Sequence, residues 1–128
     1  MTKLKHLYFP IVLFWFLISC HSKEVRTTRN LPIEPINIAQ LVDGNYLGQY
    51  TYGSFTYEVE VTVRDKRIVY IDITNNRNTM YARKAEIVIR DIISTQNNAV
   101  DAVSGATTTS KALLKAIERA LSNGYYNS

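Results

Sequence analysis

The sequence predicts an α+β fold, in which a small antiparallel sheet is packed by two helices. Residues 55–63 alternate between apolar and polar side chains, which is the period of a strand with one buried face. Two later segments, 80–96 and 111–121, carry apolar residues at helical spacing. The chain has 128 residues, 46% of them hydrophobic, and these values suit a single globular domain.

The first segment has the pattern of an export signal. A short basic start is followed by an almost wholly apolar stretch at 7–18, which is shorter than the roughly 20 residues that cross a membrane. The stretch ends in Leu17-Ile18-Ser19-Cys20, which resembles the bacterial lipobox, where cleavage precedes the cysteine and lipid is attached to its sulfur. We therefore expect residues 1–19 to be a lipoprotein signal peptide and Cys20 to be lipidated, with an uncleaved anchor helix or a chance cysteine as alternatives.

Residues 20–40 are expected to be a lipid-anchored linker. They are polar at first and have no apolar period, and Pro32 and Pro35 then interrupt isolated isoleucines. We expect an extended chain that holds the domain away from the lipid, and whose later half packs on the domain as a loose strand. The domain itself is expected to occupy residues 41–128.

Three consecutive strands predict a meander sheet. We expect them at 46–52, 55–63 and 68–74, joined by turns at Gly53-Ser54 and Arg64-Asp65-Lys66-Arg67. In the second strand the apolar residues share one face. In the third strand, one face is expected to carry Val69, Ile71 and Ile73, and the other Tyr70, Asp72 and Thr74.

Two helices are expected after the sheet, each packing on it through an apolar stripe. The first runs from about Met80 to Gln96, and its stripe consists of Tyr81, Ala85, Val88 and Ile92, with Ile89 and Ile93 beside them. Residues 99–103 are expected to form a short buried strand. The second helix covers 111–121, and Asn123-Gly124 predicts its end. The second stripe consists of Leu113, Ala116, Ile117, Ala120 and Leu121.

The stretch Asp101-Ala102-Val103-Ser104-Gly105-Ala106-Thr107-Thr108-Thr109-Ser110 leads into the second helix. Hydroxyls at a helix N-terminus suit an anion, because free amide donors and the helix dipole both favour negative charge there. Gly105 permits a backbone turn and the close approach of a ligand. From the residues alone, a phosphate-binding turn and an ordinary Ser/Thr-capped helix are equally good interpretations.

The motif resembles the flavinylation motif of FMN-binding domains, which include the C subunit of the sodium-pumping NADH:quinone oxidoreductase and the G subunit of the Rnf complex. The resemblance extends over residues 41–122 and includes the opening Asp43-Gly44-Asn45-Tyr46-Leu47-Gly48. It implies that Thr107 carries FMN through a phosphoester bond, which a separate FAD:protein FMN transferase forms. The other implied cofactor-binding residues are Asp101, Ser104, Gly105, Ala106, Thr108, Thr109 and Ser110.

The polar loop at 75–79 departs from the family pattern. Many relatives carry a His/Glu/Gly-rich segment there, which helps to line the isoalloxazine ring, and this chain lacks it. The candidates to face the ring are Asn76, Arg77, Met80 and Tyr81. The first strand also carries tyrosines on one face, at 46, 50 and 52, where packing is a better interpretation than stacking on the flavin.

These features favour a lipid-anchored electron carrier over a complete enzyme, because no NAD motif or substrate domain is visible. No triad that would activate Thr107 is visible either, so the resemblance implies an acceptor in trans, with Asp101 serving recognition by the transferase. The implied FMN would exchange electrons with membrane redox proteins. The expected location is outside the cytoplasm, on a bacterial cell membrane or outer membrane.

Two other functions stay open, a non-covalent FMN-binding reductase and a flavin-free lipoprotein that binds a partner. Nucleic acid is not an expected partner, because the formal charge of +4 falls to +2 without Lys3 and Lys5, and the basic residues are scattered among acids. One cysteine excludes an internal disulfide, and no metal site is expected.

Overall fold

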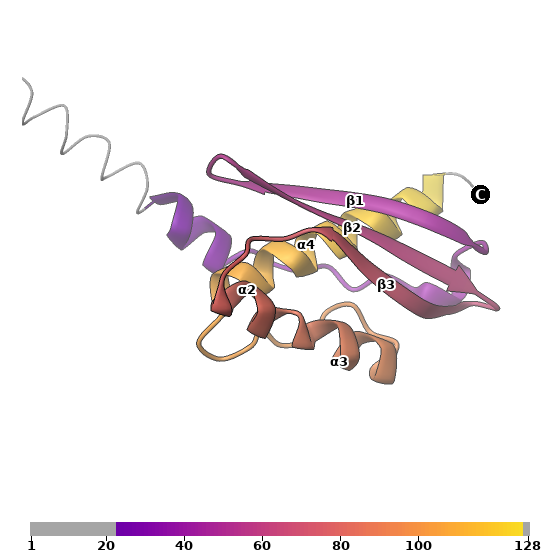
Figure 1. Ribbon diagram of the computed structural model, residues 1–128. Helices are drawn as coiled ribbons and strands as arrows, with labels where there is room; N and C mark the ends of the chain where they lie inside the picture. Colours follow the sequence, from indigo (N-terminus) through magenta and orange to yellow (C-terminus); the bar gives the residue numbers. More distant parts are fainter. Residues whose placement is uncertain (1–22, 127–128) are drawn as a thin grey trace, which may run out of the picture.

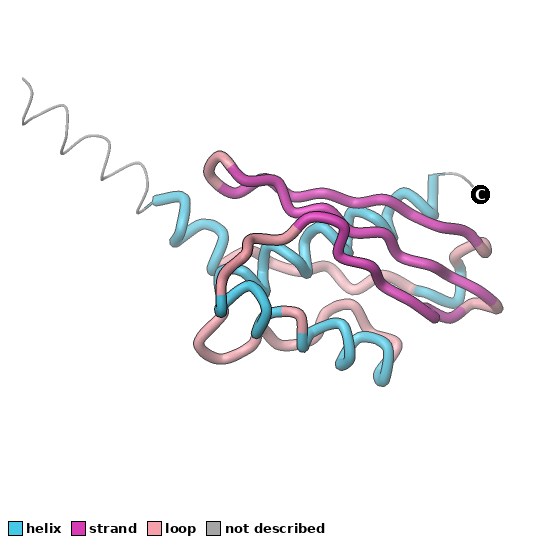
Figure 2. Tube along the Cα trace, viewed as in Figure 1, coloured by secondary structure: helices cyan, strands magenta, loops and turns pink. Residues whose placement is uncertain are grey.

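The computed structural model describes residues 23–126, so the predicted signal peptide and Cys20 lie outside the described residues. Three antiparallel strands form one sheet in the order β1 (Gly44–Tyr52), β2 (Phe55–Arg64) and β3 (Arg67–Asn75). The long helix α4 (Thr107–Tyr126) crosses one face of the sheet, and α2 (Met80–Ala85) and α3 (Ile87–Thr95) lie beside it (Figures 1 and 2). This arrangement confirms the predicted α+β fold class.

The turns between the strands follow from their residues. Between β2 and β3, Asp65 and Lys66 both have positive φ angles, 51° and 63°, as both central residues of a type I′ hairpin turn require. Between β1 and β2, Gly53 supplies a φ of 63°, and Tyr52 pairs with Phe55 across the turn. The predicted turns are therefore correct, and each strand begins or ends within two residues of its expected position.

The core lies between the sheet and α4. The alternating residues of β2 from Tyr57 to Val63 are buried, as is the whole predicted stripe of α4 from Leu113 to Leu121. Two glycines allow close packing. A Cβ on Gly48 of β1 would lie 2.0 Å from the carbonyl oxygen of Ala116, and one on Gly124 would lie 2.9 Å from a methyl of Leu41. Gly124 therefore serves packing inside α4, and the prediction that Asn123-Gly124 ends the helix is wrong.

A β-bulge alters the expected faces of β3. Thr62 pairs with Tyr70, whereas Val63 pairs with Ile68, so Val69 is an extra residue in the ladder. Ile68 and Ile71 are consequently buried, and Val69 is 49% exposed, so its predicted position on the face of Ile71 is wrong. The side chain of Gln96 accepts from the backbone N–H of Ile68 at 2.7 Å and donates to its carbonyl at 2.9 Å, as a neighbouring strand would.

The first predicted helix is broken at Glu86, which separates α2 from α3. The backbone N–H of Glu86 donates to Arg83, three residues back, and the carbonyl of Ala82 accepts from Asn76 Nδ2 at 3.2 Å. A side chain from the preceding loop thus occupies a carbonyl of the helical ladder. Val88 and Ile92 are buried as predicted, but Tyr81 is 58% exposed, which corrects its assignment to the core.

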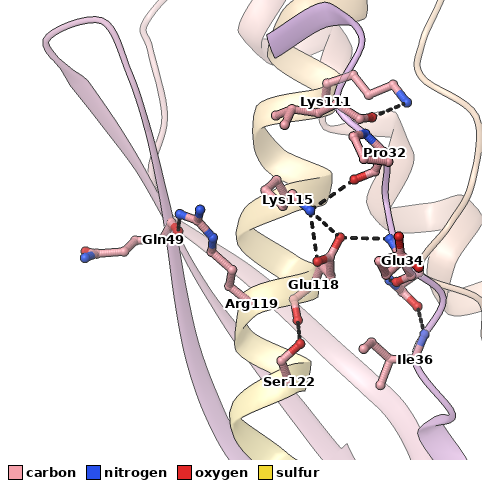
Figure 3. A network of polar contacts seen from close by, with 11 residues as sticks. Pro32, Glu34, Ile36, Gln49, Lys111, Lys115, Glu118, Arg119 and Ser122 are labelled. Atoms are coloured by element: carbon pink, nitrogen blue, oxygen red, sulfur yellow. Dashed lines mark hydrogen bonds and ion pairs between the residues drawn. The ribbon is translucent and has the colours of Figure 1, made fainter. Parts of the chain in front are cut away.

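Most of the predicted linker is bound to the domain. Residues 23–29 are helical rather than extended, and residues 31–37 run along α4 without forming a strand. Figure 3 shows Lys115 donating to the carbonyl of Pro32 at 3.0 Å, while Glu118 accepts from the backbone N–H of Glu34 at 2.9 Å. Salt-bridged Lys115 and Glu118 therefore clamp this segment from two positions of one helix.

Residues 99–103 form no strand, which corrects that expectation. The neighbouring Asn98 instead connects this part of the chain to the segment at 31–37. Its side chain bonds to backbone groups of that segment, as the backbone of a paired strand would. Its Oδ1 accepts from the N–H of Ile36 at 2.8 Å, and its Nδ2 donates to the carbonyl of Glu34 at 2.8 Å. Asn98 is fully buried, so these two bonds replace its contacts with water.

We expect Asn98→Ala to lower the free energy of unfolding by about 2 to 4 kcal/mol, because it leaves two partly buried backbone groups without partners. Urea denaturation followed by circular dichroism measures the change. Asn45→Ala is the control, since Asn45 is exposed on β1. Equal denaturation midpoints for the two variants would show that Asn98 does not hold the segment.

Candidate functional site

The motif forms a tight turn that opens into α4. The N–H of Ala106 donates to the carbonyl of Val103 at 2.9 Å, and Gly105 has a φ of 81°, which is the value that the third residue of a type II turn requires. A Cβ at Gly105 would also lie 3.1 Å from Nζ of Lys84 on α2. Glycine is therefore needed for its backbone conformation, and α4 begins two residues later at Thr107.

Ser110 joins the two ends of this turn. Its buried hydroxyl donates to the carbonyl of Ala106 at 2.7 Å and accepts from the N–H of Val103 at 3.1 Å. The backbone N–H of Ser110 also donates to Ala106, at 2.9 Å. This helical bond occupies the N–H of Ser110, so the amides at the start of α4 that have no intrahelical partner are those of residues 107–109.

A cavity of about 380 Å³ lies against the start of α4. Residues 105–109 of the motif line it. The lining residues from other parts of the chain are Arg29, Tyr52, Tyr57, Arg77, Thr79 and Tyr81. These residues come from the segment before the sheet, from β1 and β2, from the loop after β3 and from α2. The cavity is therefore built by tertiary contacts around the motif, and no carboxylate from residues 23–126 lines it.

The structure brings together most of the predicted site residues. Gly105, Ala106 and the three threonines line the cavity. Ser110 does not line it, and its hydroxyl instead donates within the turn. Asp101 and Ser104 are exposed and do not line the cavity.

Two of the four candidates for the ring, Arg77 and Tyr81, also line the cavity. Asn76 instead bonds to Glu86 and Ala82, and Met80 is exposed. Sequence reasoning missed Arg29 and Thr79, which carry no local signal. Tyr52 belonged to a tyrosine pattern that was interpreted as packing.

Arg77 gives the cavity a positive wall. Its guanidinium carbon lies 5.0 Å from the ring centre of Phe55 and 5.4 Å from that of Tyr52, and its Nη2 donates to the Tyr52 carbonyl at 3.2 Å. Its Nε is buried without a hydrogen-bond partner, and no carboxylate of the described residues forms an ion pair with it. An anionic group in the cavity would be attracted by the positive charge of this guanidinium.

Tyr52 supplies a neutral hydroxyl beside Arg77. Burial raises the pKa of this phenol above its usual value, against the lowering effect of Arg77, and Glu24 and Tyr57 add to the rise. Tyr52 therefore contributes a neutral aromatic side chain to the lining of the cavity.

A larger hollow of about 760 Å³ lies elsewhere, lined by residues such as Leu47, Gln49 and Glu58 of the sheet and by Arg119 and Asn123 of α4. Arg119 and Asn123 donate to the carbonyls of Gln49 and Leu47, at 3.1 and 2.9 Å, and so cover the open edge of β1. No residue of the motif lines this hollow, so the smaller cavity is the candidate site.

The described residues were also considered for a membrane span and for a metal site. Between residues 23 and 126, no helix combines the length and apolarity that a membrane span needs. Within the same residues, no three side chains of His, Cys, Asp or Glu gather where they could hold a metal ion.

The cavity has the chemistry that FMN requires. Its volume falls in the range of about 300 to 1,000 Å³ that is usual for small-molecule sites. The helix N-terminus and the positive charge of Arg77 suit a phosphate or another anionic group, and the aromatic side chains suit a flat ring.

Comparison with known proteins agrees with this chemistry. A search of curated proteins finds no match to the chain. The sequence model of the FMN-binding domain, in contrast, matches residues 52–122, a span that begins at Tyr52 and includes the loop of Arg77 and the whole motif. Because this span is more than half of the sequence, the chain belongs to the FMN-binding domain family, and FMN is its cofactor.

Proposed function

We propose that the protein is an extracytoplasmic electron carrier, anchored by lipid on Cys20, that holds FMN as a phosphoester of Thr107. The observation that carries the covalent link is the position of Thr107, which is the first residue of α4 and lines the cavity. A phosphate bound to its hydroxyl lies where the first-turn amides and the helix dipole stabilise negative charge. Bound FMN supplies reversible electron transfer, for which the proposed partners are membrane redox proteins.

Different residues of the cavity would bind different parts of the cofactor. The amides of residues 107–109 would bind the phosphate, and the guanidinium of Arg77 adds positive charge at the wall. Tyr52 and Tyr81 offer aromatic surfaces. These groups position the ring and set its electrostatic surroundings, which is the contribution a protein makes to flavin chemistry.

Thr107 is proposed as an acceptor that another enzyme modifies. The side chains that line the cavity are those of Arg, Tyr, Thr and Ala, and none of them is a carboxylate or imidazole that could take its proton. An FAD:protein FMN transferase with Mg²⁺ would supply the base. The Thr107 oxygen bonds to the phosphorus of the FMN half of FAD, the pyrophosphate P–O bond breaks, AMP leaves, and the hydroxyl proton passes to that base.

The flavin-free alternative would gain weight if the loop at 75–79 had lost the ring pocket. Arg77 and Thr79 of this loop instead form part of the cavity wall, although the loop has none of the composition found in many relatives. This observation favours the flavoprotein over a flavin-free partner-binding protein. A non-covalent FMN-binding reductase remains the second candidate, because its cavity would have the same lining.

Intact mass of the full chain, co-expressed with or without an active FMN transferase and measured under denaturing conditions, tests the proposal. We expect a gain of one FMN moiety, only with the transferase. Peptide mapping should place it at Thr107. No gain, when a control substrate is modified in the same cells, would refute the covalent mechanism. Flavin that is lost on denaturation, together with turnover of a soluble acceptor, would establish the reductase instead.

A further inference from the structure

The segment before the sheet is fixed against the rim of the cavity. Glu24 Oε1 accepts from the N–H of Gly53 at 2.6 Å, in the turn between β1 and β2. Thr28 is only 1% exposed, and its hydroxyl lies 3.2 Å from that of Tyr50. Lys111 of α4 donates to the carbonyl of Leu31 at 3.1 Å. Residues 23–31 are therefore tied to the hairpin and to α4, at the end of the molecule where α4 begins (Figure 1).

These ties bring Arg29 to the cavity. Every other lining residue lies at position 52 or later in the chain. Arg29 and Arg77 are the charged residues that line the cavity, and both are positive. Among residues 23–126, neither forms an ion pair with a carboxylate. The start of α4 adds its partial positive charge to the same space. No acidic residue among the described residues lines the cavity, so its wall carries positive charge alone and favours an anionic ligand.

We propose that Arg29 is a further cofactor-binding residue, whose guanidinium pairs with the phosphate of FMN. The inference rests on the proposed function for the identity of the ligand, and it extends the site beyond the family match, which begins at Tyr52. The segment at 23–31 is then a wall of the flavin site rather than a spacer. Because its contribution is to the phosphate, Arg29 sets the preference for FMN over riboflavin, which has the same ring and no phosphate.

The test compares the binding of free FMN and free riboflavin to the full chain produced without the transferase. Flavin fluorescence gives the two dissociation constants for wild type and for Arg29→Gln. We expect the wild-type chain to prefer FMN. Loss of one charge-assisted contact should weaken FMN binding about tenfold and leave riboflavin binding unchanged. The thermal midpoint should stay the same, because Arg29 is exposed.

Arg26→Gln is the matched control. Arg26 is exposed on the same helical segment and does not line the cavity, so this variant removes the same charge and should keep the wild-type preference. An equal FMN-to-riboflavin ratio in Arg29→Gln and wild type would overturn the proposal, as would a wild-type chain that binds neither flavin or both equally. Failure of the covalent mechanism is a separate result, because it appears in the mass measurement and leaves this binding ratio unaffected.

Discussion

Thr107→Ala is expected to abolish covalently bound FMN while leaving the protein folded. The hydroxyl is the proposed phosphoester oxygen, and alanine has no atom that can replace it. The turn before it should persist, since the Ser110 hydroxyl bonds to Val103 and Ala106, and the Ala106 N–H donates to the Val103 carbonyl. Intact mass and in-gel flavin fluorescence measure the attached cofactor, and thermal unfolding measures the fold.

Thr108→Ala and Thr109→Ala are the matched controls for this result. Both threonines line the cavity in the same first turn of α4, but only their backbone amides are proposed to act on the phosphate. Each control should therefore keep one FMN. Flavin on the Thr107→Ala protein, with loss from one of the two controls, would move the attachment to that neighbouring threonine.

Gly48→Ala is expected to lower the free energy of unfolding by more than about 3 kcal/mol, beyond the usual range for an extra methyl group in a core. The new Cβ would lie 2.0 Å from the carbonyl oxygen of Ala116, 2.5 Å from the nitrogen of Ala120 and 2.8 Å from its Cβ. Two of these atoms are helix backbone, so relief requires α4 to move away from β1. For a domain of this size, the thermal midpoint should fall by more than about 10 °C.

Gly44→Ala on the same strand provides the comparison for Gly48. A Cβ at Gly44 would lie 3.3 Å from the nearest atoms of the Tyr46 side chain, a far milder contact than the 2.0 Å at Gly48. Both substitutions add one methyl group, but only one of them meets the helix backbone. Similar thermal midpoints for the two variants would mean that α4 can adjust its distance from the sheet.

The sequence was sufficient for the elements whose signal is local. Alternation predicted β2, helical spacing predicted the stripe of α4, and charged residues marked the turn before β3. The bulge in β3 was missed because Ile68, Val69 and Tyr70 are all large and apolar, so alternation could not identify the extra residue. The break at Glu86 depends on the side chain of Asn76, which lies outside the helical pattern.

The site was predictable to the same extent. The motif is contiguous, so its residues could be named and placed at the start of a helix before any contact was known. The remaining walls come from distant parts of the chain, and Arg29 lies 78 positions before Thr107. Tyr81 has the spacing of a core residue, and its exposure follows from how the short helix α2 packs against α4. Tertiary placement, which composition and periodicity do not encode, assembled these groups.

The bound segment before the sheet limits how the proposed carrier can move. If Cys20 is lipidated, three steps along the chain separate it from Lys23, a reach of at most about 11 Å when fully extended. From Glu24 to Asn37 the chain repeatedly contacts the domain, so this part does not lengthen the tether between Cys20 and the domain. Such a protein does not shuttle electrons on a swinging arm. With that anchor, the proposed carrier would stay close to the lipid headgroups, and both its electron donor and its acceptor would have to dock there in turn.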